Sequence, residues 1–304
     1  MKLTVVLPGG GACGRWQVGV LKYFYDMGLF PKIKLVCGTS VGGLNGLLVS
    51  RYHADFDKAV SMWAGIICNK HIFNGMMQLN NFWDFLGMIG QLFKSNKGKS
   101  LLDPVGLYQT IDRVFGNDTL ADLMIPVIIT TTDLSTGERV VIDSITCSQY
   151  KASEIAKATS AIPIAFPPVD YWVDGVKDLC CDGGLGRNNP VEIAIEQGAT
   201  HILLIGTSPD IYPRKEVKAK VLDIAPRCLE LVMHFFEEDA WEEKEYYEEK
   251  RLLDKTLPEI KFLDIYPEES TGSALEFGNV EQFQKGYDYA LQHYPIEVIE
   301  AWLG

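Results

Sequence analysis

Apolar residues in the first 50 positions gather into short runs, separated by stretches with helical spacing. A short run made mostly of apolar residues is typical of a strand buried on both faces of a sheet, whereas a repeat every three or four residues is typical of a helix. The runs and the helical stretches alternate along the chain at 3–7, 15–28, 32–37 and 41–48. This strand–helix–strand–helix opening predicts an α/β fold with a mainly parallel sheet covered by helices.

Further strands are predicted later in the chain. They fall at 126–134, 139–143 and 201–206. The pair Asp174-Gly175 stands between alternating residues and predicts a β-hairpin, so Asp182 should follow its returning strand directly. Asn189 is expected to cap a helix that has Pro190 at its first position.

Two segments depart from this rhythm. Residues 62–93 are rich in Met, Phe and Trp and carry few charges, which favours a helical cap over an apolar pocket, a surface that contacts lipid, or ordinary core helices. We expect the cap to be an insertion over 61–100. Residues 237–249 hold eight acids and one lysine and predict the solvated face of a long helix. We expect residues 1–304 to form a single domain, with 225–304 as its mainly helical C-terminal part.

Composition narrows the classes of partner. With 28 basic and 40 acidic residues the formal charge is −12, which disfavours nucleic acid and strongly anionic bilayers. The first residues lack the hydrophobic region of a secretion signal, and no run of apolar residues is long enough to span a membrane. The seven cysteines are an odd number without CxxC spacing, which indicates no metal site and a reducing, cytoplasmic setting.

The first of three glycine motifs is GGGACG (9–14), at a predicted strand-to-helix junction. Glycines there leave backbone N–H groups exposed at a helix N-terminus, where they can hold a phosphate or a developing oxyanion. The letters also satisfy the dinucleotide fingerprint GxGxxG, and a nucleotide-binding Rossmann protein is therefore an alternative. That fold needs an acid about 20 residues later, and none occurs between Asp26 and Asp55.

The second motif, GTSVG (38–42), places Ser40 between a predicted strand and a predicted helix. A sharp turn with small neighbours would hold the serine in a strained conformation and project its hydroxyl at the carboxyl edge of the sheet. Ser40 is thus a candidate nucleophile. No histidine stands in an obvious position to accept its proton. The third motif, DGGLGRNNP (182–190), ends a predicted strand and precedes a predicted helix.

The order GGGxxG, GxSxG, DGG resembles the patatin-like phospholipase family. The stretches around 130–143, 158–169 and 274–290 are similar to further blocks of that family, so the resemblance covers most of the chain. It implies a three-layer α/β/α fold and a Ser–Asp dyad, with Ser40 as nucleophile and Asp182 as base. It also implies an oxyanion hole built from Gly9, Gly10 and Gly11, and motif glycines at Gly14, Gly38, Gly42, Gly183 and Gly184.

The implied activity is hydrolysis of lipid acyl esters, of the phospholipase A or lysophospholipase type, through an acyl-enzyme. Its partners would be a phospholipid or another acyl-ester lipid, with peripheral membrane contact and no cofactor or metal. A carboxylate with an ordinary pKa of about 4 is a weak base for an alcohol, so burial of Asp182 should raise its pKa. A lipid-binding or regulatory protein that has lost turnover, and acyl transfer to another alcohol, are alternatives.

One position departs from the family pattern. Many members carry Lys or Arg before the last glycine of GGGxxG, where this chain has Cys13. Either the basic residue is dispensable, or Arg15 replaces it from a neighbouring position, or the substrate group that it met is absent. Recognition of an anionic head group at this loop is therefore in doubt.

Overall fold

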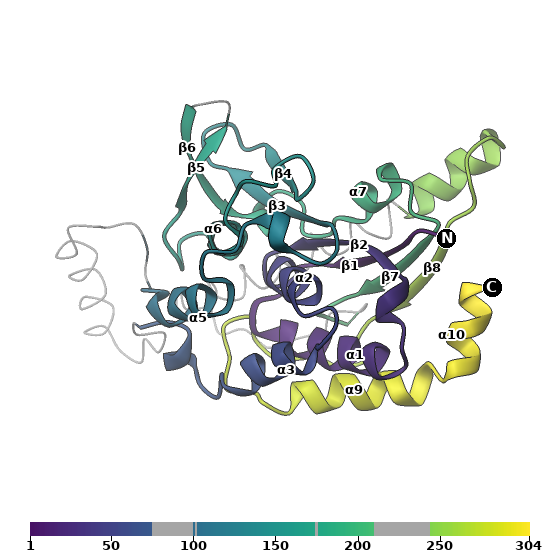
Figure 1. Ribbon diagram of the computed structural model, residues 1–304, viewed down its shortest axis with the longest axis horizontal. Coiled ribbons are helices and arrows are strands. Elements are labelled where there is room, and N and C mark those ends of the chain that lie inside the picture. The colour runs from purple at the N-terminus through teal and green to yellow at the C-terminus, as the bar shows by residue number, and fades with distance from the viewer. Residues whose placement is uncertain (75–99, 101, 174–175, 210–243) are drawn as a thin grey trace, which may run out of the picture.

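The computed structural model describes residues 1–74, 100, 102–173, 176–209 and 244–304 (Figure 1). The strands are β1 (Leu3–Leu7), β2 (Ile33–Thr39), β3 (Val127–Asp133), β4 (Arg139–Asp143), β5 (Val169–Val173), β6 (Val176–Asp182), β7 (His201–Ile205) and β8 (Lys261–Ile265). Within the described residues they form one sheet in the order β5-β6-β3-β2-β1-β7-β8, and β4 also pairs with β3. The five strands from β3 to β8 in this order are parallel, whereas β4, β5 and β6 pair antiparallel. The predicted α/β fold with a mainly parallel sheet is confirmed.

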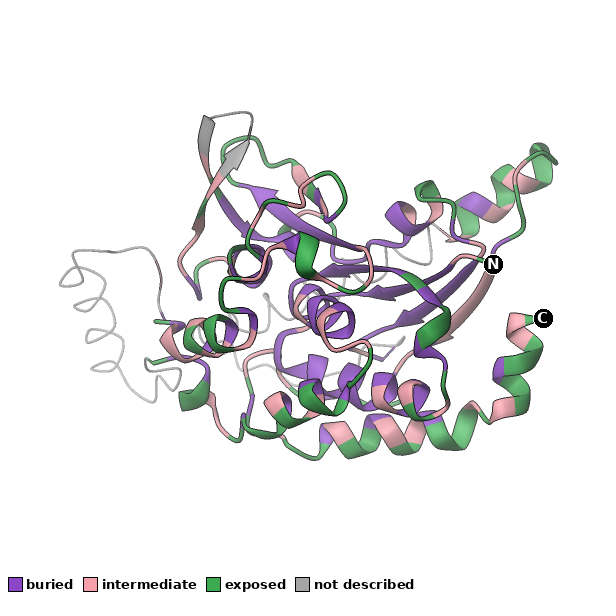
Figure 2. Ribbon diagram, in the orientation of Figure 1, coloured by how far each residue is buried: buried purple, intermediate pink, exposed green. Residues whose placement is uncertain are grey.

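Helices cover both faces of the sheet and produce three layers (Figures 1 and 2). The helices are α1 (Gly14–Asp26), α2 (Val41–Arg51), α3 (Asp57–Ala64), α5 (Val105–Phe115), α6 (Ala152–Thr159), α7 (Val191–Glu196), α9 (Gln282–His293) and α10 (Ile296–Leu303), and residues 244–253 are also helical.

Alternate residues of the central strands enter two separate cores. Val5 and Leu7 join the larger core with α1, α2, α5 and α6, whereas Val6 joins a smaller core with α7 and Tyr247. Because both faces of β1 are buried, its sequence is mostly apolar rather than alternating between apolar and polar residues.

Helix α9 brings the C-terminal part of the chain against α1. A side chain on Gly19 would place its Cβ 2.0 Å from the carbonyl oxygen of Phe283, and one on Gly286 would lie 2.2 Å from that of Trp16. The two helices therefore approach at a distance that only glycine permits at both positions.

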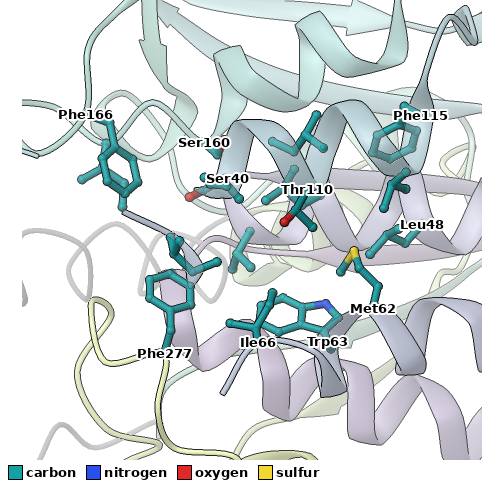
Figure 3. Close-up of a pocket in the computed structure, with 18 residues that line it drawn as sticks. Ser40, Leu48, Met62, Trp63, Ile66, Thr110, Phe115, Ser160, Phe166 and Phe277 are labelled. Atoms are coloured by element: carbon teal, nitrogen blue, oxygen red, sulfur yellow. The ribbon is translucent and has the colours of Figure 1, made fainter. Parts of the chain in front are cut away.

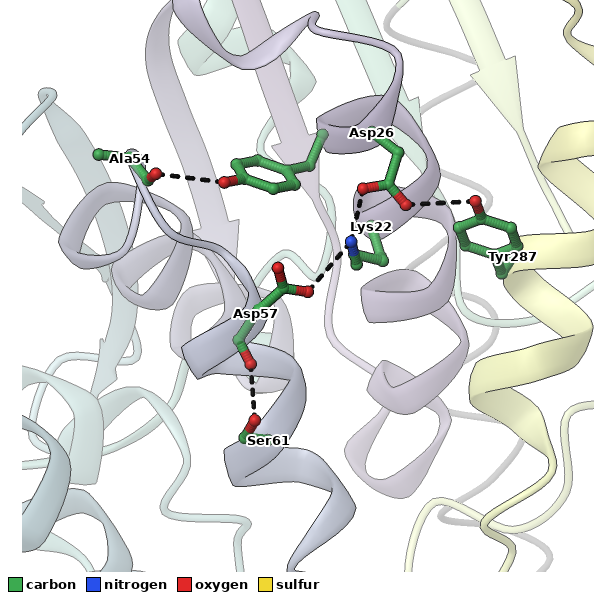
Figure 4. Close-up of polar contacts among 7 residues, drawn as sticks. Lys22, Asp26, Ala54, Asp57, Ser61 and Tyr287 are labelled. Atoms are coloured by element: carbon green, nitrogen blue, oxygen red, sulfur yellow. Dashed lines mark hydrogen bonds and ion pairs between the residues drawn. The ribbon is translucent and has the colours of Figure 1, made fainter.

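A surface cluster joins α1 to both neighbouring helices (Figure 4). Lys22 of α1 contacts Asp26 at 2.5 Å and Asp57 of α3 at 3.0 Å, and the hydroxyl of Tyr287 on α9 donates to Asp26 at 3.2 Å. The Lys22–Asp57 contact links α1 to α3, which supplies part of the pocket described below.

Several local predictions can be compared with the structure. The Asp174-Gly175 pair lies outside the described residues, but β5 and β6 on either side of it pair antiparallel, as a hairpin requires. The prediction that Asn189 caps a helix is wrong. Pro190 has a ψ of 36°, outside the helical region, so α7 begins one residue later at Val191 and Pro190 itself occupies the cap position.

The expected helical cap falls mostly outside the described residues. Helix α3 ends at Ala64, within the 61–100 segment, and residues 75–99 and 101 are not described. The acidic segment is helical from residue 244 onward, as predicted. The C-terminal part also contributes β8, which the sequence pattern did not predict. In the part of the chain that the structure describes, no helix has the length and apolar character needed to cross a bilayer.

Candidate active site

Ser40 occupies a sharp turn between β2 and α2. It has a φ of 56° and a ψ of −127°, a conformation that costs a residue with a side chain roughly 1–3 kcal/mol and is found mainly at functional positions. The flanking glycines make the turn sterically possible. A Cβ on Gly38 would lie 2.5 Å from the carbonyl oxygen of Gly42, and one on Gly42 would lie 2.0 Å from that of Leu7.

Strand β3 brings the two halves of the site together. Thr39, the last residue of β2, pairs with Thr130, and Asp182, the last residue of β6, pairs with the next residue, Thr131. β2 and β6 flank β3 on opposite sides and run in opposite directions. Their carboxyl ends therefore come together at neighbouring residues of β3. Ser40 turns out of the sheet where Asp182 arrives, although 142 positions separate them.

The two predicted dyad residues are in direct contact. Ser40 Oγ donates a hydrogen bond of 2.5 Å to Asp182 Oδ2, and both residues are only 2% exposed. The other carboxylate oxygen, Oδ1, accepts from the Gly184 backbone N–H at 2.8 Å. Burial raises the pKa of Asp182 from its ordinary value of 3.8 to about 7, and the hydrogen bonds from Ser40 and Gly184 limit the rise.

Hydrogen bonds with buried threonines hold the backbone around Ser40. The Ser40 backbone N–H donates to Thr159 Oγ1 at 2.8 Å, and that hydroxyl donates in turn to the carbonyl oxygen of Thr130 at 2.8 Å. Thr39 and Thr130 share a further hydroxyl–hydroxyl bond of 2.6 Å. The strained backbone is thus held by three side chains that are fully buried.

The glycine loop lies beside the serine and is anchored at its first residue. Asn188 Oδ1 accepts from the Gly9 N–H at 3.0 Å, while Asn188 Nδ2 and Thr207 Oγ1 donate to the Gly9 carbonyl oxygen at 3.3 and 2.7 Å. The Gly9 N–H is therefore already engaged. Within the described residues no acceptor takes the N–H of Gly10 or Gly11. Gly11 has a φ of 56°, and a Cβ there would lie 2.1 Å from the Ala274 carbonyl oxygen.

An apolar pocket opens from Ser40 (Figure 3). Leu44 and Leu48 of α2 continue its wall along successive turns beyond the serine, and Trp63 and Phe115 close it from α3 and α5. From Ser40 to Leu48 the helix advances about 12 Å at 1.5 Å per residue. The apolar wall therefore extends about this far from the serine along α2.

Arg15 braces this pocket. It is 3% exposed, its guanidinium donates to the carbonyl oxygens of Ile66 and Phe277, and it stacks over the Trp63 ring at 5.5 Å. Ile66 and Phe277 both line the pocket. The position of Arg15 therefore favours a role in holding the pocket wall over a role as the missing basic residue of the glycine loop. Cys13 Sγ contacts the Gly272 carbonyl oxygen at 3.7 Å.

Sequence reasoning assigned no role to Asn188 or Thr207. Asn188 lies inside the DGGLGRNNP motif, in which only Asp182, the glycines and the predicted helix start at Asn189 and Pro190 were assigned a role. Thr207 comes directly after β7, and the rule that carboxyl ends of parallel strands share one edge could have pointed to it. The structure groups no three His, Cys, Asp or Glu residues at metal-binding spacing within its described ranges.

The fold and the site together define the class: an α/β protein with a serine-centred site at the carboxyl edge of a mainly parallel sheet. Residues 5–195 match the family model described as patatin-like phospholipase. The chain belongs to the patatin-like phospholipase family, whose members are typically lipid acyl hydrolases.

Individual relatives are distant. The chain is 26% identical over 212 residues to the neuropathy target esterase sws of Drosophila melanogaster and 26% identical over 205 residues to human patatin-like phospholipase domain-containing protein 6. Each match covers 67% of this chain and 13% of the relative. Among solved structures, human GIVD cytosolic phospholipase A2 is similar with a TM-score of 0.50 at 9% identity, over 99% of this chain and 60% of that one. This likeness shows the fold.

Proposed function

We propose that this chain is a serine-dependent lipid acyl hydrolase in which Ser40 is the nucleophile and Asp182 the general base. The observation that carries the proposal is the 2.5 Å hydrogen bond from Ser40 Oγ to a buried carboxylate, at the mouth of an apolar pocket. A serine that was only a turn residue would need neither the strained backbone nor the acceptor. Membership of the family supports an ester of a fatty acid as the substrate.

The proposed chemistry starts with proton transfer to Asp182. Ser40 Oγ attacks the ester carbonyl carbon while its proton moves to Asp182 Oδ2, and the leaving alcohol then takes that proton as the acyl-enzyme forms. A water molecule attacks the acyl-enzyme, gives its proton to Asp182, and the fatty acid leaves as the proton returns to Ser40. With a pKa of about 7, Asp182 is a far better proton acceptor than an ordinary carboxylate and is still about half ionised at neutral pH.

The glycine loop would stabilise the oxyanion of both tetrahedral intermediates. Because Gly9 is bonded to Asn188, the N–H groups proposed to face the oxyanion are those of Gly10 and Gly11. Each well-placed donor of this kind contributes about 3 kcal/mol to the transition state. Asn188 would act as a positioning residue, since it fixes the loop to the segment that follows Asp182.

The proposal is tested with a fluorophosphonate probe and p-nitrophenyl esters. The parent protein should be labelled at Ser40 and should hydrolyse the esters, and Ser40→Ala should lose labelling and at least about 10⁴-fold of the activity. Ser135→Ala, which removes an exposed hydroxyl between β3 and β4, is the matched control and should behave as the parent. Folded parent protein that neither reacts nor hydrolyses would instead favour a lipid-binding protein without turnover.

A further inference from the structure

A second hollow, which we call the basic groove, lies between α3 and α5. It encloses about 760 Å³ and is lined on one side by α3 and the segment after it, and on the other by α5. Four of its lining residues can carry positive charge: Lys58, Lys70, His71 and Arg113. Among the described residues that line it there is no Asp or Glu.

Two of these cations have no carboxylate partner in the part of the chain that the structure describes. Lys58 contacts Asp55 at 3.0 Å, and the His71 ring nitrogen Nδ1 is bonded to the Gly65 carbonyl oxygen at 3.0 Å. Lys70 and Arg113 are exposed, and among the described residues neither makes an ion pair. The chain has a formal charge of −12, so a lining with two cations that lack an ion-pair partner among the described residues is unusual for this surface.

The local charge decides what binds here. At physiological ionic strength the Debye length is about 8 Å, so acidic residues elsewhere on the surface are largely screened from the groove. An anion in the groove therefore interacts mainly with the nearby lysine and arginine, and much less with the negative charges elsewhere on the protein. Arginine and lysine together are typical of phosphate recognition.

The basic groove adjoins the pocket that holds Ser40. Met62, Ile66, Thr110 and Val114 line both hollows, so they form the wall between them. Ile67, the residue after Ile66 in the chain, is 60% exposed. Cations, an exposed aliphatic side chain and an apolar pocket therefore occur side by side, a combination that matches an amphiphile with an anionic head better than a nucleic acid or an acidic peptide.

We propose that the basic groove binds the phosphate of a membrane lipid head group through Lys70 and Arg113, and so orients the Ser40 pocket towards the lipid surface. The binding itself does not depend on catalysis. Only its consequence, delivery of a lipid ester to Ser40, rests on the proposed hydrolase. The groove would thus offer a site for anion recognition apart from the glycine loop, where Cys13 stands in place of a basic residue.

The test measures vesicle binding in the Ser40→Ala background, where no lipid is consumed. Cosedimentation with phosphatidylcholine vesicles that contain phosphatidylglycerol should weaken about fivefold for each cation removed, or about 25-fold in Lys70→Gln/Arg113→Gln. Arg113→Lys, which keeps the charge, should retain most of the binding. Lys250→Gln/Lys255→Gln removes the same charge from the helix 244–253 and the residues after it, at the other end of the molecule (Figure 1), and should bind as the Ser40→Ala parent.

Three results would overturn the proposal. Unchanged vesicle binding in Lys70→Gln/Arg113→Gln would show that the groove is not involved. An equal loss in the Lys250→Gln/Lys255→Gln control would show that net charge alone governs binding. Saturable binding of inorganic phosphate to the groove, without any binding to phosphatidylglycerol vesicles, would assign the site to a soluble phosphate instead. Failure of the proposed hydrolase is read separately, from the probe and ester assays on Ser40.

Discussion

Replacement of Asp182 by Asn should remove activity and yet stabilise the folded protein at alkaline pH. Asn has nearly the same shape, so its Oδ1 can still accept from the Gly184 N–H and its Nδ2 can donate to Ser40 Oγ. What the substitution removes is a negative charge that burial makes costly, since the pKa of Asp182 is raised to about 7. The ionised base of the active site would therefore lower the free energy of unfolding of the parent protein.

The direction of the pKa shift of Asp182 determines how the stability of the protein changes with pH. A carboxyl group whose folded-state pKa lies above its unfolded value contributes stability that is fully present below pH 3.8 and is lost as the pH rises through about 7. Asn does not titrate and shows no such loss. With these two pKa values, the free energy of unfolding of Asp182→Asn relative to the parent should increase by about 3 kcal/mol between about pH 4.5 and about pH 8.

Urea denaturation at the two pH values, followed by tryptophan fluorescence, measures this difference. Asp288→Asn on α9 removes an exposed carboxylate and is the control for the loss of one charge. A difference between Asp182→Asn and the parent that stays constant within about 0.5 kcal/mol across this range would refute the reasoning, because it would mean that Asp182 is not desolvated. In the parent, kcat/KM should fall below about pH 7 as Asp182 takes up its proton.

Two further substitutions test the loop and the pocket. Gly11→Ala forces a Cβ to within 2.1 Å of the Ala274 carbonyl oxygen. It should lower the free energy of unfolding, measured by thermal denaturation, by about 3 kcal/mol or more and remove most of the esterase activity. Gly28→Ala is also at positive φ but has no atom within 4 Å, so it should cost about 1 kcal/mol and leave activity intact. Leu44→Phe fills the pocket one turn beyond Ser40 and should lower the rate on p-nitrophenyl octanoate, relative to the acetate, by about tenfold or more; an unchanged ratio would show that the acyl chain does not lie along α2.

The strands and the turn that carry the site were predictable because each has a clear pattern within a short stretch of sequence. β1 and β2 are mostly apolar runs, and the GTSVG glycines can be recognised as a turn from composition alone. β8 was missed since KFLDI lies at the edge of the sheet and is only partly buried, so its pattern is weak. The Asn189 cap was placed one residue early, because the ψ angle that removes Pro190 from the helix is not visible in the letters.

The sequence by itself determined the fold class and the strand-to-helix turn that holds Ser40, because these depend on residues close together in the chain. The pairing of Ser40 with Asp182, 142 positions away, was indicated only by the resemblance to the family. Only the tertiary structure decided that Thr130 and Thr131 of β3 align the ends of β2 and β6. It also decided that Asn188 occupies the Gly9 N–H and that the Lys70 and Arg113 groove shares a wall with the Ser40 pocket. Strand register and helix packing set these contacts through the burial of many distant side chains at once, and no local pattern encodes that sum.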